Sequence, residues 1–260
     1  MDGKNIEKLG DELFEAWHSR TPIGQLTEQH PSMTVDEAYG IQQRTIARRR
    51  QSGVRVVGKK IGLTSKVVQK MLGVDQPDFG YLLSDMVFGE GEAIPIASLI
   101  APKVEGEIAF VLESRLEGPG ITNADVLRAT AFVMPCFEIV DSRVRDWKIR
   151  IQDTVADNAS AAAFVLGDRA VDPRDVDLTL CGMVLEKNGE ILATGAGAAA
   201  LGSPVNAVAW LANQLGKFGI ALEANEVILS GSLAAMLPAQ AGDNFRCSIG
   251  GIGTVTTRFV

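Results

Sequence analysis

Three glutamates lie inside two apolar segments of the chain. Glu105 and Glu107 are two residues apart in the segment 104–112, and Glu138 lies near the end of the segment 133–140. Residues i and i+2 of a β-strand point to the same face, about 6.5 Å apart along the chain. An unpaired buried carboxylate costs several kcal/mol, and a second like charge nearby raises that cost. One divalent cation would compensate both carboxylates, because such cations prefer hard oxygen ligands, so the pattern predicts a metal site.

An edge strand with its carboxylates in water is the alternative for any single glutamate. The order Glu105, Gly106, Glu107 is compatible with such a strand. Three glutamates on two strongly apolar strands favour the metal site over this alternative. Cys136 could share a face with Glu138, but we expect an inert buried thiol there rather than a ligand.

Composition and charge exclude several classes of function. The chain has 260 residues, enough for one large core, and a formal net charge of −7, which argues against general nucleic-acid binding. The basic run 48–50 ends a predicted helix, where cations complement the helix dipole. No stretch of about 18 apolar residues could span a membrane, and the charged N-terminus does not resemble a signal peptide. Cys136, Cys181 and Cys247 are widely separated without CxxC spacing, which fits a reducing cytoplasm.

The histidine content restricts the proton chemistry. The chain has two histidines, His18 and His30, and both precede residue 31. A histidine-rich zinc site or a Ser-His-Asp triad in the later strands would have to recruit one of them from the N-terminal region. We therefore expect lysine, aspartate, glutamate or bound water to move protons.

Residues 1–53 are predicted to form an N-terminal helical segment. Apolar residues repeat at helical spacing over 5–19, and Thr34 and Glu37 form a capping box that opens a second helix ending near residue 50. We expect these helices to form a cap or an interface, with Trp17 and Tyr39 exposed, because nothing in them suggests chemistry.

Residues 54–260 are predicted to form a strand-rich catalytic domain, which makes the whole chain α+β. Asn188 and Gly189 predict a hairpin turn. The run 195–200 matches a variant of the dinucleotide fingerprint, but the next helix begins too late, so we interpret it as a loop. The expected strands are 54–61, 104–112, 133–140, 161–166, 178–186, 190–194, 227–229, 245–249 and 254–260, with helices at 66–72, 123–131 and 203–218 and a turn at 76–80.

Five segments, taken together, resemble the 2-hydroxypenta-2,4-dienoate hydratases, also called 2-oxopent-4-enoate or 2-keto-4-pentenoate hydratases. The similarity covers essentially the whole chain. Each motif is weak alone, but their order and spacing are specific for the hydratase and decarboxylase group of the fumarylacetoacetate hydrolase-like fold. The segments are Gly58-Lys59-Lys60-Ile61-Gly62-Leu63-Thr64-Ser65, Gln76-Pro77-Asp78-Phe79-Gly80, Val104-Glu105-Gly106-Glu107-Ile108-Ala109-Phe110, Gln152-Asp153-Thr154-Val155-Ala156-Asp157-Asn158-Ala159-Ser160 and Leu229-Ser230-Gly231-Ser232-Leu233.

The resemblance implies a fold, a reaction and partners. The fold is a mixed β roll with short helices and a Mg²⁺ or Mn²⁺ site. The reaction is the addition of water to 2-hydroxypenta-2,4-dienoate, giving 4-hydroxy-2-oxopentanoate, in the meta-cleavage catabolism of aromatic compounds. The family commonly forms large rings of dimers, so a homo-oligomer is expected, and its hydratases can associate with the decarboxylase of the same pathway.

The resemblance also implies roles for individual residues. Glu105, Glu107 and Glu138 match the metal-binding carboxylates of the family. Lys60 matches its active-site lysine, and Asp78 matches an acidic residue on a mobile lid segment. From the residues alone, Lys60 could be a surface lysine at a strand end and Asp78 a simple turn residue.

Substrate contacts follow from the same resemblance. Ser160 and the pair Gly231-Ser232 lie in motifs that line the substrate pocket of the family. The substrate carries a carboxylate beside a 2-oxygen, which together chelate a hard cation that can polarise the oxygen. A lysine nearby would hold the carboxylate, stabilise the enolate or transfer a proton.

Three other functions stay open at this point. Sister enzymes decarboxylate 4-oxalocrotonate with the same metal site, but they tend to carry proline where this chain has Gly106. A hydrolase of acylpyruvates would cleave a C–C bond and usually needs a base such as histidine, which the metal motifs lack. A non-catalytic subunit that binds a decarboxylase partner has no physical need for three buried glutamates.

Overall fold

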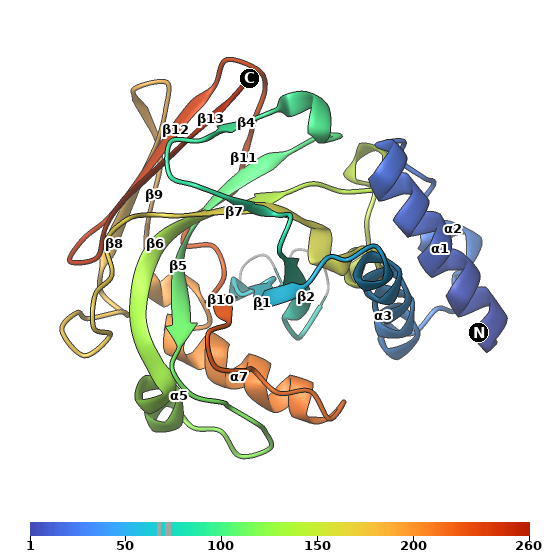
Figure 1. Cartoon of the computed structure of the whole chain (residues 1–260), viewed down its shortest axis with the longest axis horizontal. Helices are drawn as coiled ribbons and strands as arrows, with labels where there is room; N and C mark the ends of the chain where they lie inside the picture. The colour runs from blue at the N-terminus through green and yellow to red at the C-terminus, as the bar shows by residue number, and fades with distance from the viewer. Residues whose placement is uncertain (67–68, 71–73) are drawn as a thin grey trace.

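The described residues form two β-sheets: the larger lies at the centre of the molecule, and the smaller lies at the end opposite the N-terminal helices (Figure 1). The computed structural model describes residues 1–66, 69–70 and 74–260. The strands are β1 (Val56–Gly62), β2 (Asp78–Leu83), β3 (Val87–Phe88), β4 (Ala93–Ile94), β5 (Lys103–Leu112), β6 (Thr130–Val140), β7 (Ala161–Leu166), β8 (Gly182–Lys187), β9 (Glu190–Ala196), β10 (Val227–Leu229), β11 (Leu237–Pro238), β12 (Asn244–Ile249) and β13 (Gly253–Phe259). The helices are α1 (Gly3–Ser19), α2 (Leu26–Gln29), α3 (Val35–Gln51), α5 (Asn123–Ala129), α6 (Ile151–Ala156) and α7 (Pro204–Gly216).

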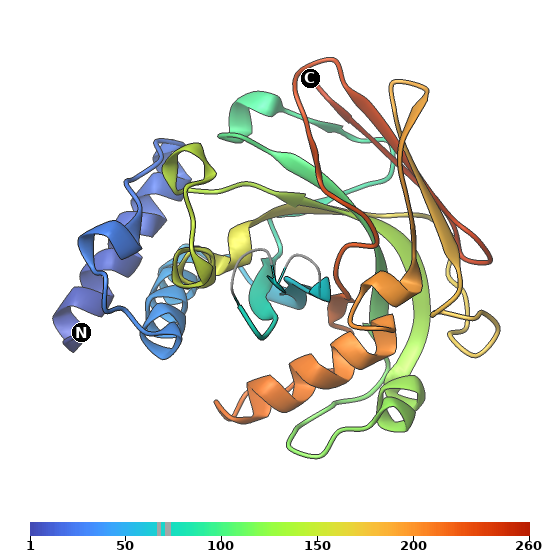
Figure 2. The same ribbon diagram turned by 180° about the vertical axis from the view of Figure 1, so that it is seen from behind.

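The larger sheet is mixed and has the long strands β5 and β6 at its centre (Figures 1 and 2). Among the described residues its order is β2-β1-β10-β5-β6-β7-β3, with β11 also paired to β5, and the smaller sheet has the order β4-β13-β12-β8-β9. Because β5 is hydrogen-bonded to β10 on one side and to β6 on the other, its glutamates do not lie on an edge strand. This mixed sheet with short helices is the expected α+β fold.

The two faces of the β5–β6 pair have different partners. On one face Phe137 packs edge-on against Phe245 of the smaller sheet, with ring centroids 6.4 Å apart. Gly106 lies opposite Phe137 in the ladder, and a Cβ at this glycine would lie 2.8 Å from the sulfur of Cys247. Glycine at this position therefore lets the smaller sheet approach closely, while the glutamates on either side point to the opposite face.

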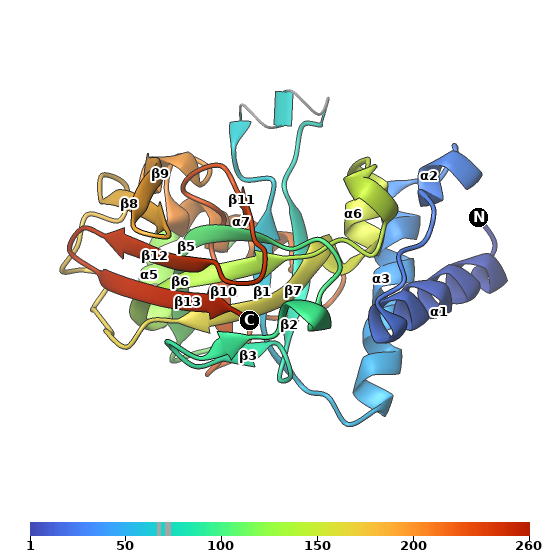
Figure 3. The same ribbon diagram turned by 90° about the horizontal axis from the view of Figure 1, so that it is seen from above.

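The N-terminal helices α1 to α3 lie at one end of the molecule, away from the smaller sheet (Figure 3). Tyr39 of α3 is 4% exposed and stacks on Phe79 of β2, with ring centroids 4.3 Å apart. Trp17 of α1 is half-buried, with the guanidinium of Arg143 over its ring. The expectation that these two aromatic residues are exposed is therefore wrong for Tyr39, because α3 packs against the larger sheet.

Most predicted elements are present, with bounds shifted by a few residues. The capping box of Thr34 and Glu37 opens α3, and Asn188 and Gly189 form the turn between β8 and β9. The expected turn at 76–80 is wrong from Asp78 onward, where β2 begins, and α6 was not predicted. The predicted helix 66–72 lies largely outside the described residues. Of the helices described, none is long and apolar enough to cross a membrane.

Candidate active site

The antiparallel pairing of β5 and β6 brings the three glutamates together. Glu105 lies directly opposite Glu138 in the ladder, and Glu107 is two residues further along the same face of β5. One carboxylate oxygen from each residue lies within 4.8 Å of the others. Glu107 and Glu138 are 0% exposed, and Glu105 faces a cavity. Like charges opposite each other destabilise an antiparallel pair, so this arrangement needs a compensating charge.

Burial raises the pKa of all three carboxyl groups, and repulsion from Glu138 raises the pKa of Glu105 and Glu107 further. Burial and then the Glu138 carboxylate raise the pKa of Glu105 to about 7. The same two causes raise the pKa of Glu107 well above its usual value, and burial raises the pKa of Glu138. Glu107 Oε1 and Glu138 Oε2 accept no hydrogen bond from the described residues. Buried oxygen atoms without donors, on a face with three acids, fit a hard divalent cation such as Mg²⁺ or Mn²⁺.

Lys60 of β1 lies beside this cluster. Its Nζ lies 3.0 Å from Glu138 Oε1 and donates a hydrogen bond to the carbonyl oxygen of Ala159 at 2.8 Å. Burial alone would lower the pKa of Lys60, but the Glu138 and Asp78 carboxylates outweigh burial and raise that pKa above its usual value. Lys60 is therefore a buried cation and not a surface lysine at a strand end.

Asp78, the first residue of β2, lies opposite Gly62 of β1 in the ladder. A Cβ at Gly62 would overlap Asp78 Oδ1 and lie 3.3 Å from Lys60 Nζ, so both charged groups lie against this glycine. Burial raises the pKa of Asp78, and Lys60 opposes the shift. Asp78 is a buried strand residue rather than a simple turn residue, because pairing with β1 draws residues 78–80 into the sheet.

The segment after β10 holds Glu107 in place. The Gly231 N–H donates to Glu107 Oε2 at 2.8 Å. Gly231 has a φ of +101°, and a Cβ there would overlap the side chain of Thr64, so glycine is required. Gly231 thus supports a glutamate and is not among the residues that line the cavity, whereas Ser232 lines it and donates to the carbonyl oxygen of Ala234 at 2.6 Å.

A cavity of about 770 Å³ opens in front of Lys60, Asp78 and Glu105. Ser160 also lines it, so the structure brings both predicted serines to the same space as the charged residues. Much of the remaining wall is apolar, and no histidine is present among its described residues. Apolar lining residues include Trp147, Ile149, Ile151 and Met236.

The sequence did not reveal the turn that contacts Lys60. Asn158, Ala159 and Ser160 have φ values of 54°, 49° and 57°, a left-handed conformation that residues other than glycine rarely adopt. The Asn158 side chain pairs with the backbone of Tyr81 in β2, accepting from its N–H at 2.8 Å and donating to its carbonyl oxygen at 2.9 Å. Asparagine tolerates this conformation better than most residues, and the presence of Asn158 was the only local feature of the sequence that could have indicated the turn.

The chain is similar to known enzymes over its whole length. Residues 52–260 match the family model described as fumarylacetoacetate (FAA) hydrolase C-terminal. A 2-hydroxypent-2,4-dienoate hydratase of Pseudomonas putida is 63% identical over 222 residues, which cover 85% of this chain and 100% of the relative. A 2-hydroxyhexa-2,4-dienoate hydratase of Comamonas testosteroni is 54% identical over 260 residues, which cover 99% of this chain and 98% of the relative.

A solved structure shares the whole fold. The 4-oxalocrotonate decarboxylase from Pseudomonas putida G7, complexed with magnesium and adipate, matches with a TM-score of 0.97 at 36% identity, covering 100% of this chain and 99% of the decarboxylase. The same enzyme complexed with calcium and acetate matches with a TM-score of 0.95. The predicted fold is confirmed, and divalent ions in this relative agree with the acidic cluster found here.

Proposed function

Because the chain belongs to the fumarylacetoacetate hydrolase family, we propose that it is a hydro-lyase that adds water to 2-hydroxypenta-2,4-dienoate and forms 4-hydroxy-2-oxopentanoate. This reaction belongs to the meta-cleavage catabolism of aromatic compounds. The observation that carries the proposal is the buried cluster of Glu105, Glu107 and Glu138, which has Lys60 beside it, in a chain 63% identical to a hydratase of this substrate.

The three glutamates would hold a Mg²⁺ or Mn²⁺ ion. When bound, the ion supplies a Lewis acid for the 2-oxygen and carboxylate of the substrate. The magnesium complex of the structurally similar decarboxylase supports this choice of ion. The unpaired oxygens of Glu107 and Glu138 also support a bound ion. Among the described residues Lys60 is the one cation in contact with the cluster, and its single positive charge does not balance three carboxylates.

We assign the handling of substrate charge and protons to Lys60 and Asp78. Hydration of the dienol adds a proton at C5, the hydroxyl group of water at C4 and a proton at C3, while the C2 hydroxyl loses its proton and becomes the 2-oxo group, so the net gain is one water. The Lys60 ammonium can hold the substrate carboxylate or the developing enolate and can donate a proton. The raised pKa of Asp78 lets this carboxyl group carry a proton at the same wall of the cavity. The hydroxyl groups of Ser160 and Ser232 would orient the substrate.

Product analysis separates the hydratase from its alternatives. Purified protein with Mg²⁺ or Mn²⁺ would be mixed with 2-hydroxypenta-2,4-dienoate, the dienol absorbance followed and the product identified by mass. Gain of one water is expected. Inertness toward the dienol, with loss of CO₂ from 4-oxalocrotonate or C–C cleavage of an acylpyruvate, would contradict the proposal. The identities of 63% and 54% to hydratases, against 36% to the decarboxylase, favour water addition.

We also propose a boundary near residue 53 and assembly into a homo-oligomer. The boundary is supported by the start of the family match at residue 52.

The assembly is supported by an exposed apolar strand. Ile191 and Leu192 are exposed on β9, the last strand in the order of the smaller sheet, and exposed apolar edge strands favour association. Sedimentation at several concentrations tests this assembly, and a mass equal to one chain throughout would contradict it. Co-sedimentation with the decarboxylase of the pathway tests the proposed partner.

A further inference from the structure

We propose that Arg143 is a positioning residue for Lys60 and that it acts through the turn 158–160. The inference rests on the hydratase function proposed above. The turn lies between α6 and β7 and carries the Ala159 carbonyl oxygen that accepts the hydrogen bond from Lys60 Nζ. Arg143 itself lies beyond the end of β6 and is not among the residues that line the cavity.

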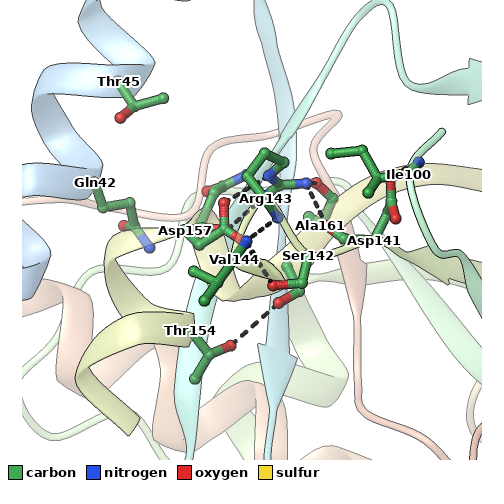
Figure 4. Close-up of polar contacts among 12 residues, drawn as sticks. Gln42, Thr45, Ile100, Asp141, Ser142, Arg143, Val144, Thr154, Asp157 and Ala161 are labelled. Carbon is green, nitrogen blue, oxygen red and sulfur yellow. Dashed lines mark hydrogen bonds and ion pairs between the residues drawn. The ribbon is translucent and has the colours of Figure 1, made fainter. Parts of the chain in front are cut away.

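The Arg143 guanidinium holds the turn at both ends (Figure 4). Nη2 donates to the carbonyl oxygen of Asp157 at 2.5 Å, immediately before the turn. Nη1 donates to the carbonyl oxygen of Ala161 at 3.0 Å, immediately after it, and to that of Asp141 at 2.6 Å. One planar cation therefore fixes the distance between the two ends of the turn and ties both to the end of β6.

The Asp157 carboxylate orients this guanidinium. Asp157 Oδ1 accepts from Arg143 Nε at 2.5 Å, and Oδ2 accepts from the Arg143 backbone N–H at 2.8 Å. Arg143 is 2% exposed, and Asp157 is buried as well. A buried ion pair is weak evidence for stability, since apolar residues often replace such a pair without loss. The planar fork of arginine instead supplies fixed directions to several acceptors, which a positioning role requires.

The turn needs such a restraint. Three consecutive residues with positive φ and no glycine persist only where the surrounding structure holds them. We call the hydrogen bonds from Arg143 to the carbonyl groups of Asp157 and Ala161 the clamp. Without the clamp, the turn would relax toward ordinary backbone angles and the Ala159 carbonyl would move away from Lys60. The Lys60 ammonium would keep its charge but lose one of the two contacts that place it, and a shift of about 1 Å in a positioned group can reduce turnover about 100-fold.

The variant Arg143→Lys tests the clamp, because an ammonium keeps the charge but cannot reach acceptors at both ends of the turn. We expect kcat to fall about 10- to 100-fold, with KM and Mn²⁺ affinity changed less than about twofold. In metal-free protein, hydrogen–deuterium exchange of the peptide spanning 157–161 should become at least about tenfold faster, since its protection depends on the closed turn. Asp243→Asn is the matched control, because it removes a largely buried ion pair with Lys187 in the smaller sheet, and it should leave kcat unchanged.

Faster exchange of the turn together with a lower kcat would support the inference. Faster exchange with unchanged kcat, a lower kcat with a protected turn, or a parallel loss of Mn²⁺ affinity would overturn it. If Arg143→Lys does not fold, Asp157→Asn takes its place under the same criteria, because it retains the side-chain shape and the carbonyl contact. Wild-type protein that does not hydrate the dienol would contradict the proposed function, while the exchange measurement would still decide whether Arg143 holds the turn.

Discussion

At the scale of single residues, the site is dominated by excess negative charge. Glu105, Glu107, Glu138 and Asp78 face the single ammonium of Lys60. Burial raises the pKa of each carboxyl group, repulsion from the Glu138 carboxylate adds to the rise at Glu105 and Glu107, and the carboxylates together raise the pKa of Lys60. A divalent cation would remove most of the excess, which ties the charge state of the residues to the metal.

Replacing one proposed metal ligand should abolish most of the activity. Glu107→Gln keeps the side-chain shape but removes charge and ligand strength, so we expect kcat/KM to fall by at least about 100-fold and Mn²⁺ binding to weaken in a titration. Glu190→Gln is the matched control, because Glu190 is exposed on the β8–β9 hairpin. Full activity of the wild type after chelator treatment and removal of metal would contradict the metal site.

Substitution of Lys60 should separate charge from proton transfer. Lys60→Ala should lower kcat while Mn²⁺ affinity is kept or improved, since the ammonium is a like charge beside the proposed ion. Lys60→Arg restores the charge, but guanidinium does not deprotonate in proteins, so kcat should stay low. Wild-type kcat and a normal pH profile in Lys60→Arg would reduce Lys60 to an electrostatic clamp and shift proton transfer to Asp78 or bound water.

At the scale of elements, strand register places each functional group. The β5–β6 ladder sets Glu105 opposite Glu138, and a slip of one residue would turn the glutamates of one strand to the other face. The β1–β2 ladder likewise sets Asp78 opposite Gly62, two residues after Lys60. These pairings depend on close approaches of backbone that only glycine allows at certain positions.

A side chain at Gly62 should therefore disturb the site more than the fold. Gly62→Ala puts a methyl group into the space of Asp78 Oδ1, so we expect kcat to fall at least about tenfold while circular dichroism stays unchanged. Gly182→Ala in β8 is the control, because a Cβ there would meet no atom within 4 Å. Equal effects of the two substitutions on kcat would argue against a special role of Gly62.

At the scale of the whole molecule, the N-terminal helices brace the site in addition to covering the sheet. Gln42 of α3 donates to the carbonyl oxygen of Phe79 at 2.9 Å and to that of Val155 at 3.0 Å. These carbonyl groups belong to β2, immediately after Asp78, and to α6, which leads into the turn that contacts Lys60. Residues 1–53 therefore contact both segments that position the charged residues.

A rise in pH should lower the global stability of the metal-free protein, and bound manganese should raise it. The folded pKa of Glu105 is about 7, above its unfolded value of 4.5, so folding binds protons in this range. The stabilising contribution is complete below pH 4.5 and is lost as pH rises through 7, so metal-free protein should melt at lower temperature at pH 8 than at pH 5.5. Manganese at about 100 times its Kd adds about 2.7 kcal/mol, or roughly 5–11 °C in Tm, at pH 8.

Thermal melts at both pH values, with and without manganese, check this prediction. The manganese shift should be smaller at pH 5.5, where protons compete for the ligands. The variant Glu107→Gln shows how much of the pH dependence comes from groups outside the cluster. Its melting temperature should depend less on pH and should change little when manganese is added. A manganese shift of equal size at both pH values would contradict the assigned cause.

The sequence by itself determined the local chemistry of this protein. The two-residue period of strands and the apolar surroundings placed Glu105 and Glu107 on one buried face, and the burial cost of carboxylates pointed to a cation. The capping box at Thr34 and the turn at Asn188 could also be predicted from the sequence alone. Such features depend on residues within a few positions of one another, so a single sequence contains all the information they require.

Only the tertiary structure decided which distant groups meet. The register that pairs Glu105 with Glu138, the strand that takes up Asp78 and the packing that buries Tyr39 all arise between segments far apart in the chain. The same holds for Arg143, whose acceptors lie 14 and 18 residues away, beyond α6. Local patterns describe how each segment folds, but contacts between segments depend on how the whole core packs. For that reason only the tertiary structure shows that Arg143 contacts both ends of the turn that positions Lys60.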